Sequence, residues 1–416
     1  MRILFTSYAE KTHFIGMVPL AWALHNAGHE VRVASQPELT DTITHAGLTA
    51  VPVGKNHGLG RVYAITQRVA AEESEFDFAE DDPEHLPWEF LKKKFEAAVL
   101  WWCRLVNDPM ISDLVTFARH WQPDLVIWEP VTFAGPIAAQ ACGAAHARFL
   151  WGLDLFGRIR SHYVRLRDEQ PPGERGQDVL AEWIGLRAAK HGGRFTPDMA
   201  DGHFTLDYTP PSLRVDTGVD YLPVRYIPYN GVSVVEPWLR LPPQRPRVCL
   251  TLGTAAVERL DGYALPVYDI LDALSDLDVE VVATLRGVDP ERVPANARVV
   301  DFAPLHALVP SCSVVIHHGG GGSFSTSVIN GVPQLVLADM YDAPLKGKLL
   351  ADQGAGLTMH TRDVTGAKVR ECVQRMLKEP SFARRAGELR QETLGMPTPG
   401  DVVPQIEEAI LRHRSR

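Results

Sequence analysis

The stretch VVIHHGGGGSFSTSVINGVP spans residues 314–333. It starts as an apolar run typical of a buried strand, passes through four consecutive glycines at 319–322, and continues into a segment typical of a helix. Glycines leave backbone N–H groups open to an anion, and a helix N-terminus carries partial positive charge, so the stretch predicts a phosphate cradle. The groups expected to hold a diphosphate are His318, Gly319, Gly320, Gly321, Gly322 and Ser323.

The glycines alone also fit a tight turn that needs positive φ angles. Their spacing matches neither the G-x-G-x-x-G pattern with a following acid nor G-x-x-x-x-G-K-[ST], which disfavours dehydrogenases and P-loop proteins. His317 and His318 could be imagined as a metal pair, but no further ligand residues lie nearby in the sequence. We therefore expect no metal cofactor.

The segments on both sides of this stretch alternate between strand and helix patterns. RVCLTLGT, VEVVATL, RVVDF and PQLVLAD predict strands of one unit, and RILFTS, HEVRVAS, PDLVIWEP and HARFLWG predict strands of another. This alternation is typical of an α/β fold with two doubly wound parallel sheets. We expect an N-terminal domain at 1–228, a proline-rich linker at 229–246, a C-terminal domain at 247–399, and a last helix at about 400–416 that could cap either domain, with the N-terminal one as our choice.

Composition limits the partners. The chain has 416 residues, a net charge of −9 and only isolated basic clusters, so we expect no nucleic-acid partner. No apolar run approaches the ~18 residues of a membrane span, and the first residues resemble a strand more than a signal peptide. The five cysteines contain no C-x-x-C pair and predict buried thiols rather than disulfides or zinc ligands. These features together predict a cytoplasmic protein.

Longer motifs resemble a known family. HHGGGGS, with DFAPLHALVPSC before it and GVPQLVLADMYDAPLKGKLLADQGAGL after it, resembles the C-terminal signature of bacterial antibiotic glycosyltransferases of GT-B fold. The segments THFIGMVPLAWALHNAGHEVRVAS, PDLVIWEPVTFAGPIAAQACGAAHARFLWG and RYIPYNG resemble macrolide deoxysugar transferases of the desosaminyl, mycaminosyl and mycarosyl type. The resemblance covers nearly the whole chain, and it implies two facing Rossmann-like domains.

The resemblance implies that the C-terminal domain binds a thymidine-diphosphate (TDP) sugar. Thr254 would lie across the diphosphate from His318, and Phe302 to Leu305 would border the base and ribose. In the stretch Tyr341-Asp342-Ala343, Asp342 would accept hydrogen bonds from the sugar, although it could also be a helix N-cap. Ala343 stands where many relatives have Gln, which favours a deoxygenated sugar. Gly321 stands where the family often has Ala, and we expect it only to loosen the cradle.

The N-terminal domain would supply the base. An acceptor hydroxyl must lose its proton as it attacks the anomeric carbon, and a neutral imidazole suits that step. His13 matches the family's catalytic histidine, and Glu129 matches the usual Asp that orients it. The resemblance implies an inverting transfer to a macrolide or other polyketide aglycone, with the acceptor near Phe14, Phe133 and the region 58–102.

Several relatives need an activator protein related to haem monooxygenases, and the aromatic segment 88–102 is our candidate surface for it, although it could equally be a core-facing helix. The sequence leaves open whether the chain works as a homodimer. Two other functions remain: an epimerase of nucleotide sugars with the same fold, and a catalytically silent partner of a transferase.

Overall fold

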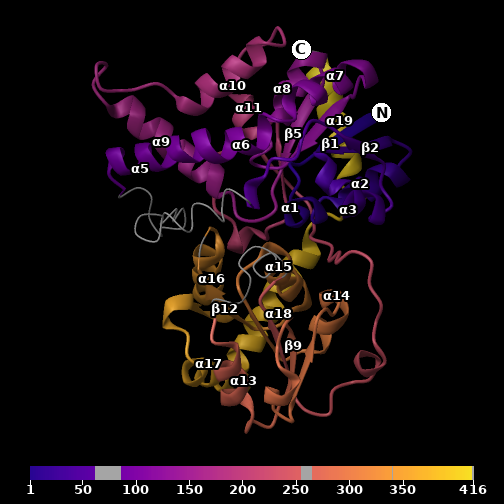
Figure 1. Cartoon of the computed structure of the whole chain (residues 1–416), viewed down its shortest axis with the longest axis vertical. Coiled ribbons are helices and arrows are strands. Elements are labelled where there is room, and N and C mark those ends of the chain that lie inside the picture. Colours follow the sequence, from indigo (N-terminus) through magenta and orange to yellow (C-terminus); the bar gives the residue numbers. More distant parts are fainter. Residues whose placement is uncertain (61–85, 254–264, 340, 415–416) are drawn as a thin grey trace.

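The chain folds into two lobes that stack along the long axis of the molecule (Figure 1). The computed structural model describes residues 1–60, 86–253, 265–339 and 341–414. Each lobe is built on one parallel sheet, as the sequence predicts. The predicted division at 1–228, 229–246 and 247–399 remains a proposal.

The N-terminal lobe contains a seven-stranded sheet of order β3-β2-β1-β4-β5-β6-β7. All its ladders are parallel. Its strands are β1 (Arg2–Thr6), β2 (Glu30–Ser35), β3 (Ala50–Pro52), β4 (Leu125–Trp128), β5 (Ala145–Phe149), β6 (Thr205–Asp207) and β7 (Tyr221–Pro223).

The C-terminal lobe contains a six-stranded sheet of order β10-β9-β8-β11-β12-β13. Its ladders are parallel as well. The strands are β8 (Arg247–Thr251), β9 (Glu280–Thr284), β10 (Ala297–Val300), β11 (Val314–His317), β12 (Gln334–Ala338) and β13 (Gly356–His360).

Helices cover both faces of each sheet. Those of the first lobe are α1 (Lys11–Ile15), α2 (Val18–Asn26), α3 (Thr40–His45), α5 (Trp88–Ala97), a π-helical turn η3 (Ala98–Cys103), α6 (Arg104–Asn107), α7 (Ile111–Trp121), α8 (Ala134–Cys142), α9 (Leu155–Glu169), α10 (Val179–Ala189) and α11 (Asp198–Asp201). The rest are α13 (Val267–Leu274), α14 (Leu305–Leu308), α15 (Gly321–Asn330), α16 (Ala343–Asp352), α17 (Gly366–Lys378), α18 (Pro380–Gly395) and α19 (Val403–Arg414).

Successive strand residues point to opposite faces, so each sheet supports two apolar layers. In β4, Val126 and Trp128 join one core cluster, and Leu125 and Ile127 join the other. This explains why the strands are apolar along their whole length and not alternating, as expected for parallel sheets with two covered faces.

The last helix, α19, returns to the first lobe, where both chain ends lie (Figure 1). Val402, Val403, Ile406 and Ile410 lie in the same core cluster as Ile3 and other residues of the first sheet. The C-terminal segment therefore ties the two lobes together, since α18 packs on α15 in the second lobe.

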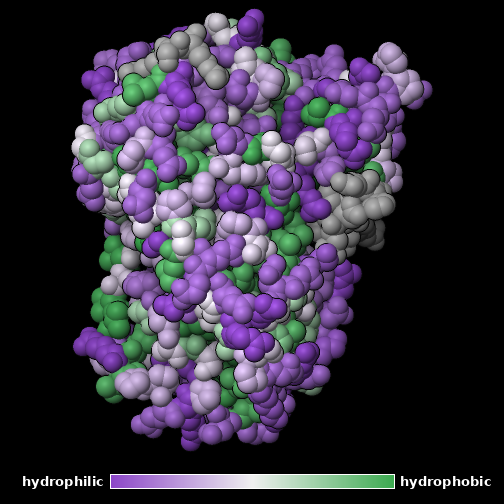
Figure 2. Space-filling view, turned by 180° about the vertical axis from the view of Figure 1, so that it is seen from behind, coloured by the Kyte–Doolittle hydropathy of each residue, from purple (hydrophilic) through white to green (hydrophobic). Residues whose placement is uncertain are grey.

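The face shown in Figure 2 is mostly hydrophilic, with hydrophobic residues between the polar ones. None of the helices in the described part of the chain is long and apolar enough to cross a membrane. All five cysteines are free and at least partly buried, as predicted.

In both sheets the strand order reverses in the middle, between β1 and β4 in the first lobe and between β8 and β11 in the second. Crevices at such switch points, outside the carboxyl ends of the strands, are where open α/β sheets bind ligands. In the first lobe, His13 and Glu129 lie after the two strands of the switch point, β1 and β4. In the second lobe, His318 and the glycines follow β11.

Candidate active site between the two lobes

His13 and Glu129, which lie 116 residues apart in the sequence, form a hydrogen-bonded pair. His13 lies on α1, immediately after β1, and Glu129 follows β4, the strand next to β1. The His13 Nδ1 and Glu129 Oε2 atoms are 3.0 Å apart. Among the described residues no hydrogen bond to His13 Nε2 is present, and the His13 side chain keeps 10% of its surface exposed while Glu129 keeps none.

Additional donors hold the Glu129 carboxylate. Thr132 Oγ1 donates to Oε1, while the backbone N–H of Val131 donates to Oε2 at 3.3 Å. The indole N–H of Trp151 also donates to Oε2, at 3.0 Å. A buried carboxylate whose oxygens are saturated with donors keeps one orientation, so it can direct one nitrogen of His13 toward itself and leave the other available to a substrate.

The glycine stretch is a helix N-terminus, as predicted. Gly320 is the N-cap of α15, and no side chain caps the helix, so its first N–H groups remain open. Gly319 has a φ of 88°, and a Cβ at this position would overlap Ala343. Any other residue at position 319 would therefore have a strained backbone conformation and would collide with Ala343.

His318 is packed against glycines from two strand ends. A Cβ on Gly253 or on Gly320 would approach its ring to 2.5 Å. Burial, together with the nearby Lys346 ammonium, lowers the pKa of His318 to about 4. Its Nδ1 is enclosed and has no hydrogen-bond partner among the described residues. A neutral ring beside a helix N-terminus that no side chain caps fits the predicted contact with a diphosphate.

His317, the neighbour, has a structural role. Its Nε2 donates to Gln334 Oε1 at 2.7 Å, and its Nδ1 accepts from the Gly319 N–H at 3.0 Å. Burial lowers its pKa to about 3. Because both ring nitrogens are engaged, this histidine fixes the entry of the glycine turn and cannot pair with His318 on a metal.

Asp342 forms an ion pair at the start of α16 and accepts a hydrogen bond from the first lobe. Its Oδ2 lies 2.6 Å from Lys346 Nζ and accepts from the Leu153 N–H of the first lobe at 3.1 Å. Asp342 is the N-cap residue of α16, but its side chain makes no hydrogen bond to the first N–H groups of the helix. The alternative prediction, that its carboxylate serves only as a helix cap, is therefore wrong. Lys346 also donates to the carbonyl of Gly319 at 3.2 Å.

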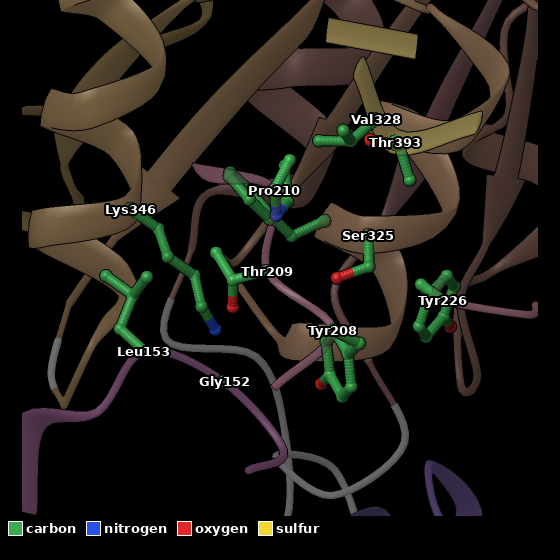
Figure 3. A pocket seen from close by; sticks show the side chains of 11 residues that line it. Gly152, Leu153, Tyr208, Thr209, Pro210, Tyr226, Ser325, Val328, Lys346 and Thr393 are labelled. Carbon is green, nitrogen blue, oxygen red and sulfur yellow. The ribbon is translucent and has the colours of Figure 1, made fainter. Parts of the chain in front are cut away.

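The surroundings of this ion pair are visible in Figure 3. The Lys346 amino group reaches between Leu153 and Thr209 in a small pocket lined by both lobes, which Tyr208, Tyr226 and Ser325 also border. The Tyr226 hydroxyl lies 3.3 Å from both the Gly322 carbonyl and Thr326 Oγ1. Burial raises the pKa of Tyr226 and that of Tyr208. Both phenols therefore stay neutral and act as hydrogen-bonding groups of the seam.

Other predicted donor residues are placed as follows. Phe302 is 45% exposed, and Leu305 begins α14, so a base could pack on this edge. Tyr341 has a φ of 58°, which is unusual for a residue with a side chain, and its ring lies 6.3 Å from that of Trp102. Strain of this kind is often found at ligand sites. Thr254 and residues 61–85 of the predicted acceptor region lie outside the described residues.

Three expectations need correction. Phe14 and Phe133 are 0% exposed and belong to the two core clusters of the first lobe, so their rings offer no surface to an acceptor in this conformation. Gly321 does more than loosen the cradle. A Cβ there would lie 2.5 Å from the Trp151 carbonyl, so glycine permits the close approach of the two lobes.

A second histidine cluster lies away from this crevice. Both His146 Nε2 and His203 Nε2 face Asp198 Oδ2, at 2.9 and 3.5 Å. The His203 Nδ1 accepts the backbone N–H of His146 at 3.1 Å, so its Nε2 carries the proton. A histidine that binds metal donates from its other nitrogen. The tautomer of His203 is therefore the wrong one for binding a metal through Nε2. The cluster instead joins β5 to α11 through hydrogen bonds.

Comparisons with known proteins identify the family. Residues 22–253 match the N-terminal domain model of "Erythromycin biosynthesis protein CIII-like" proteins, and residues 268–409 match the C-terminal domain model. The chain belongs to this family. The curated relatives are named glycosyltransferases, and so are the solved structures it resembles, which makes this chain an antibiotic deoxysugar glycosyltransferase of GT-B fold.

Similarity to individual relatives extends over the whole length. The chain is 51% identical to 10-deoxymethynolide desosaminyltransferase of Streptomyces venezuelae, covering 100% of this chain and 98% of the relative. It is 46% identical to tylactone mycaminosyltransferase of Streptomyces fradiae, with 100% and 94% covered. Among solved structures, glycosyltransferase VinC in complex with dTDP matches with a TM-score of 0.88 and 38% identity, covering 99% and 100%.

Residue-level reasoning from the sequence missed three side chains of this site: Thr132, Trp151 and Lys346. Two of them had a signal in their spacing, since Thr132 lies three residues after Glu129 and Lys346 lies one helical turn after Asp342. Trp151 is the Trp of HARFLWG itself and lies at the carboxyl end of a predicted strand, which is the edge where ligand sites form.

Proposed function

We propose that this enzyme transfers a deoxysugar from a TDP-sugar to a hydroxyl of a macrolide or other polyketide aglycone, with inversion at the anomeric carbon. The observation that carries the proposal is the arrangement at the seam: a buried His13–Glu129 pair on one lobe faces an open helix N-terminus with a neutral His318 on the other. Relatives named for the same chemistry support it.

His13 acts as the general base. Its Nδ1 proton is held by Glu129, so Nε2 accepts the proton of the acceptor hydroxyl as that oxygen attacks the anomeric carbon. The bond between the anomeric carbon and the diphosphate oxygen breaks, and its electron pair leaves with TDP. Backbone N–H groups at the start of α15 and the His318 ring stabilise the negative charge that develops on the diphosphate. These groups suffice for the step, so we propose no metal cofactor.

The donor is a deoxysugar because of Ala343. Ala343 is 6% exposed, and its Cβ packs where a side chain on Gly319 would lie. A short apolar side chain at this point gives a sugar hydroxyl no partner, whereas Asp342 next to it retains a carboxylate that can bind one. A donor that lacks one hydroxyl therefore loses no hydrogen bond here.

The exposed part of segment 88–102 suits a protein partner. Trp101 is 74% exposed, with Leu100 at 45% and Phe90 at 41%, whereas Leu91 and Phe95 face the core. Exposed aromatic residues are enriched in protein interfaces. We propose that this surface binds an activator protein, and Trp101→Ala would then reduce activation without changing the basal rate. Unchanged activation would contradict this part of the proposal.

Mass spectrometry of reaction products tests the main proposal. The enzyme is incubated with a panel of TDP-deoxysugars, with and without an amino group, and with macrolactone and other polyketide aglycones. We expect an aglycone that has gained one deoxysugar, together with free TDP, and a β-glycoside by NMR when the donor is α-linked. A new sugar nucleotide formed from the donor alone would indicate an epimerase and contradict the proposal.

A further inference from the structure

Trp151 contacts both members of the His13–Glu129 pair. Its ring stacks on the His13 ring with centroids 4.1 Å apart and an interplanar angle of 25°. Its Nε1 donates to Glu129 Oε2 at 3.0 Å, the oxygen that also meets His13 Nδ1. One side chain thus fixes the ring plane of the histidine and the position of the carboxylate that orients it.

The backbone beside this side chain faces the donor half. The Trp151 carbonyl accepts from the Tyr208 hydroxyl and lies against Gly321, the first residue of α15. Two residues later, the Leu153 N–H donates to Asp342 at 3.1 Å. The segment 151–153 therefore contacts the base on one side, and the helix N-terminus and the Asp342 carboxylate on the other.

Buried charges hold this segment in place. Arg148, at the end of β5, donates to both carboxylate oxygens of Asp154, at 3.1 and 2.5 Å. Asp154 also caps α9 by accepting from the Gly157 N–H at 2.9 Å. Arg148 is 0% exposed and Asp154 is 3% exposed. Residues on both sides of the segment are thus anchored, which holds its backbone beside the His13–Glu129 pair.

We propose that Trp151 is a positioning residue for sugar transfer: its indole N–H fixes the Glu129 carboxylate that orients His13, and its ring face stabilises the imidazolium that forms when the base takes the acceptor proton. The inference rests on the proposed role of His13. An aromatic face against a cation contributes attraction beyond packing, and a charge-assisted hydrogen bond fixes a carboxylate more firmly than a neutral one.

Two substitutions separate the two contributions. Trp151→Phe keeps a ring and removes the N–H donor, and Trp151→Leu removes both. Losing a hydrogen bond to a charged group predicts a ~10- to 100-fold lower kcat for Trp151→Phe. Losing the ring face predicts a further ~2- to 30-fold decrease for Trp151→Leu. The KM of the acceptor and the Kd of dTDP should change less than ~3-fold, because neither contact binds substrate.

The pH dependence of kcat/KM would stay unchanged if Trp151 had only a structural role, so it tests the proposal separately from kcat. Without the indole N–H, Glu129 faces His13 with less of its charge compensated, so the acidic limb of the kcat/KM profile moves to higher pH in Trp151→Phe. Removing the ring face takes stabilisation away from the imidazolium, so the limb moves back to lower pH in Trp151→Leu compared with Trp151→Phe.

Trp121→Phe is the matched control, because the Trp121 Nε1 donates to a carboxylate oxygen of Glu30 at 3.2 Å, away from the crevice. It should leave kcat and the pH profile unchanged. If Trp151→Leu fails to fold, benzothienylalanine at position 151 provides a ring of indole shape without the N–H donor.

Wild-type kcat and pH profile in Trp151→Phe or in the benzothienyl variant would overturn the inference, and so would an equal loss in Trp121→Phe. His13→Ala in the same assay distinguishes a failure of the proposed function from a failure of the proposed role of Trp151. Full turnover in His13→Ala contradicts the proposed function itself. Loss of turnover there, with normal Trp151 variants, contradicts only the role of Trp151.

Discussion

The two lobes use the same place in the same type of sheet for different chemistry. At the switch point of the second lobe, β11 ends at His317, and His318 and glycines then lead into α15, which has no capping side chain. At the switch point of the first lobe, His13 lies on the helix that follows β1 and Glu129 directly follows β4, and Trp151 contacts both. One edge offers backbone N–H groups, and the other offers side chains.

This difference shows that, in a parallel sheet, the position of a ligand site and the chemistry of that site have separate causes. The fold determines where a ligand lies, because the carboxyl ends of the central strands leave a crevice. The residues after those strands decide what happens there. Glycines allow a diphosphate to approach backbone, whereas a buried carboxylate that orients an imidazole creates a proton acceptor. The predictions below change one half at a time.

The largest effect is expected for Glu129→Gln in the first lobe. The amide keeps the size of the side chain but removes the negative charge that orients His13, and comparable changes in histidine–carboxylate pairs lower kcat by ~10⁴-fold. We expect a decrease of ~10²- to 10⁴-fold with an unchanged Kd for dTDP, measured by steady-state kinetics and calorimetry. Glu30→Gln serves as control, since Glu30 also accepts from an indole N–H but lies outside the crevice.

Gly319→Ala in the second lobe should produce the opposite pattern. The added Cβ meets Ala343 at a φ of 88°, so the start of α15 must shift and dTDP binding should weaken at least ~10-fold. Gly28 is the matched control, with a φ of 90° and nothing within 4 Å of an added Cβ. Gly28→Ala should cost about 1 kcal/mol of unfolding free energy and leave dTDP binding unchanged. Equal binding losses in both variants would contradict the cradle.

The sequence predicted both sheets, the strand ends and most of this crevice. Each motif consists of a predicted strand and the functional residue that follows it. Because the strands at the switch point are neighbours in the sheet, the residues that follow them lie close together. Contacts between lobes were not predictable, because they depend on how two loops meet. The approach of Trp151 to Gly321 and the contact of Leu153 with Asp342 belong to this class. The burial of Phe14 and Phe133 was missed for another reason, because both rings pack into the cores of the first lobe.

Lys346→Met tests the ion pair in the donor half. Without the ammonium group, Asp342 is left buried without its countercharge, and breaking a buried pair in this way costs ~3–5 kcal/mol. We expect a lower unfolding midpoint in urea and a ~10-fold higher KM for the donor sugar, since Asp342 loses its fixed orientation. The double variant with Asp342→Asn should regain stability but not donor affinity. Recovery of both would contradict a role for Asp342 in sugar binding.

The smallest effect is a pH dependence of stability. Burial lowers the pKa of His317 to about 3 and that of His318 and His146 to about 4. The unfolded chain binds protons at these sites near pH 6.5 and the folded chain does not, so stability is complete above about pH 6.5 and falls between there and pH 4. Urea unfolding at several pH values measures the slope, and a flat profile would contradict the burial of these rings.

The central claim is that the second lobe binds the donor and the first lobe supplies the base. The most direct test is His13→Ala, measured for dTDP affinity by calorimetry and for glycoside formation by mass spectrometry on the same preparation, with the exposed His120→Ala as control. We expect an unchanged Kd for dTDP and a ~10²- to 10⁴-fold loss of turnover in His13→Ala, while His120→Ala retains both. Turnover near the wild-type rate in His13→Ala would contradict it.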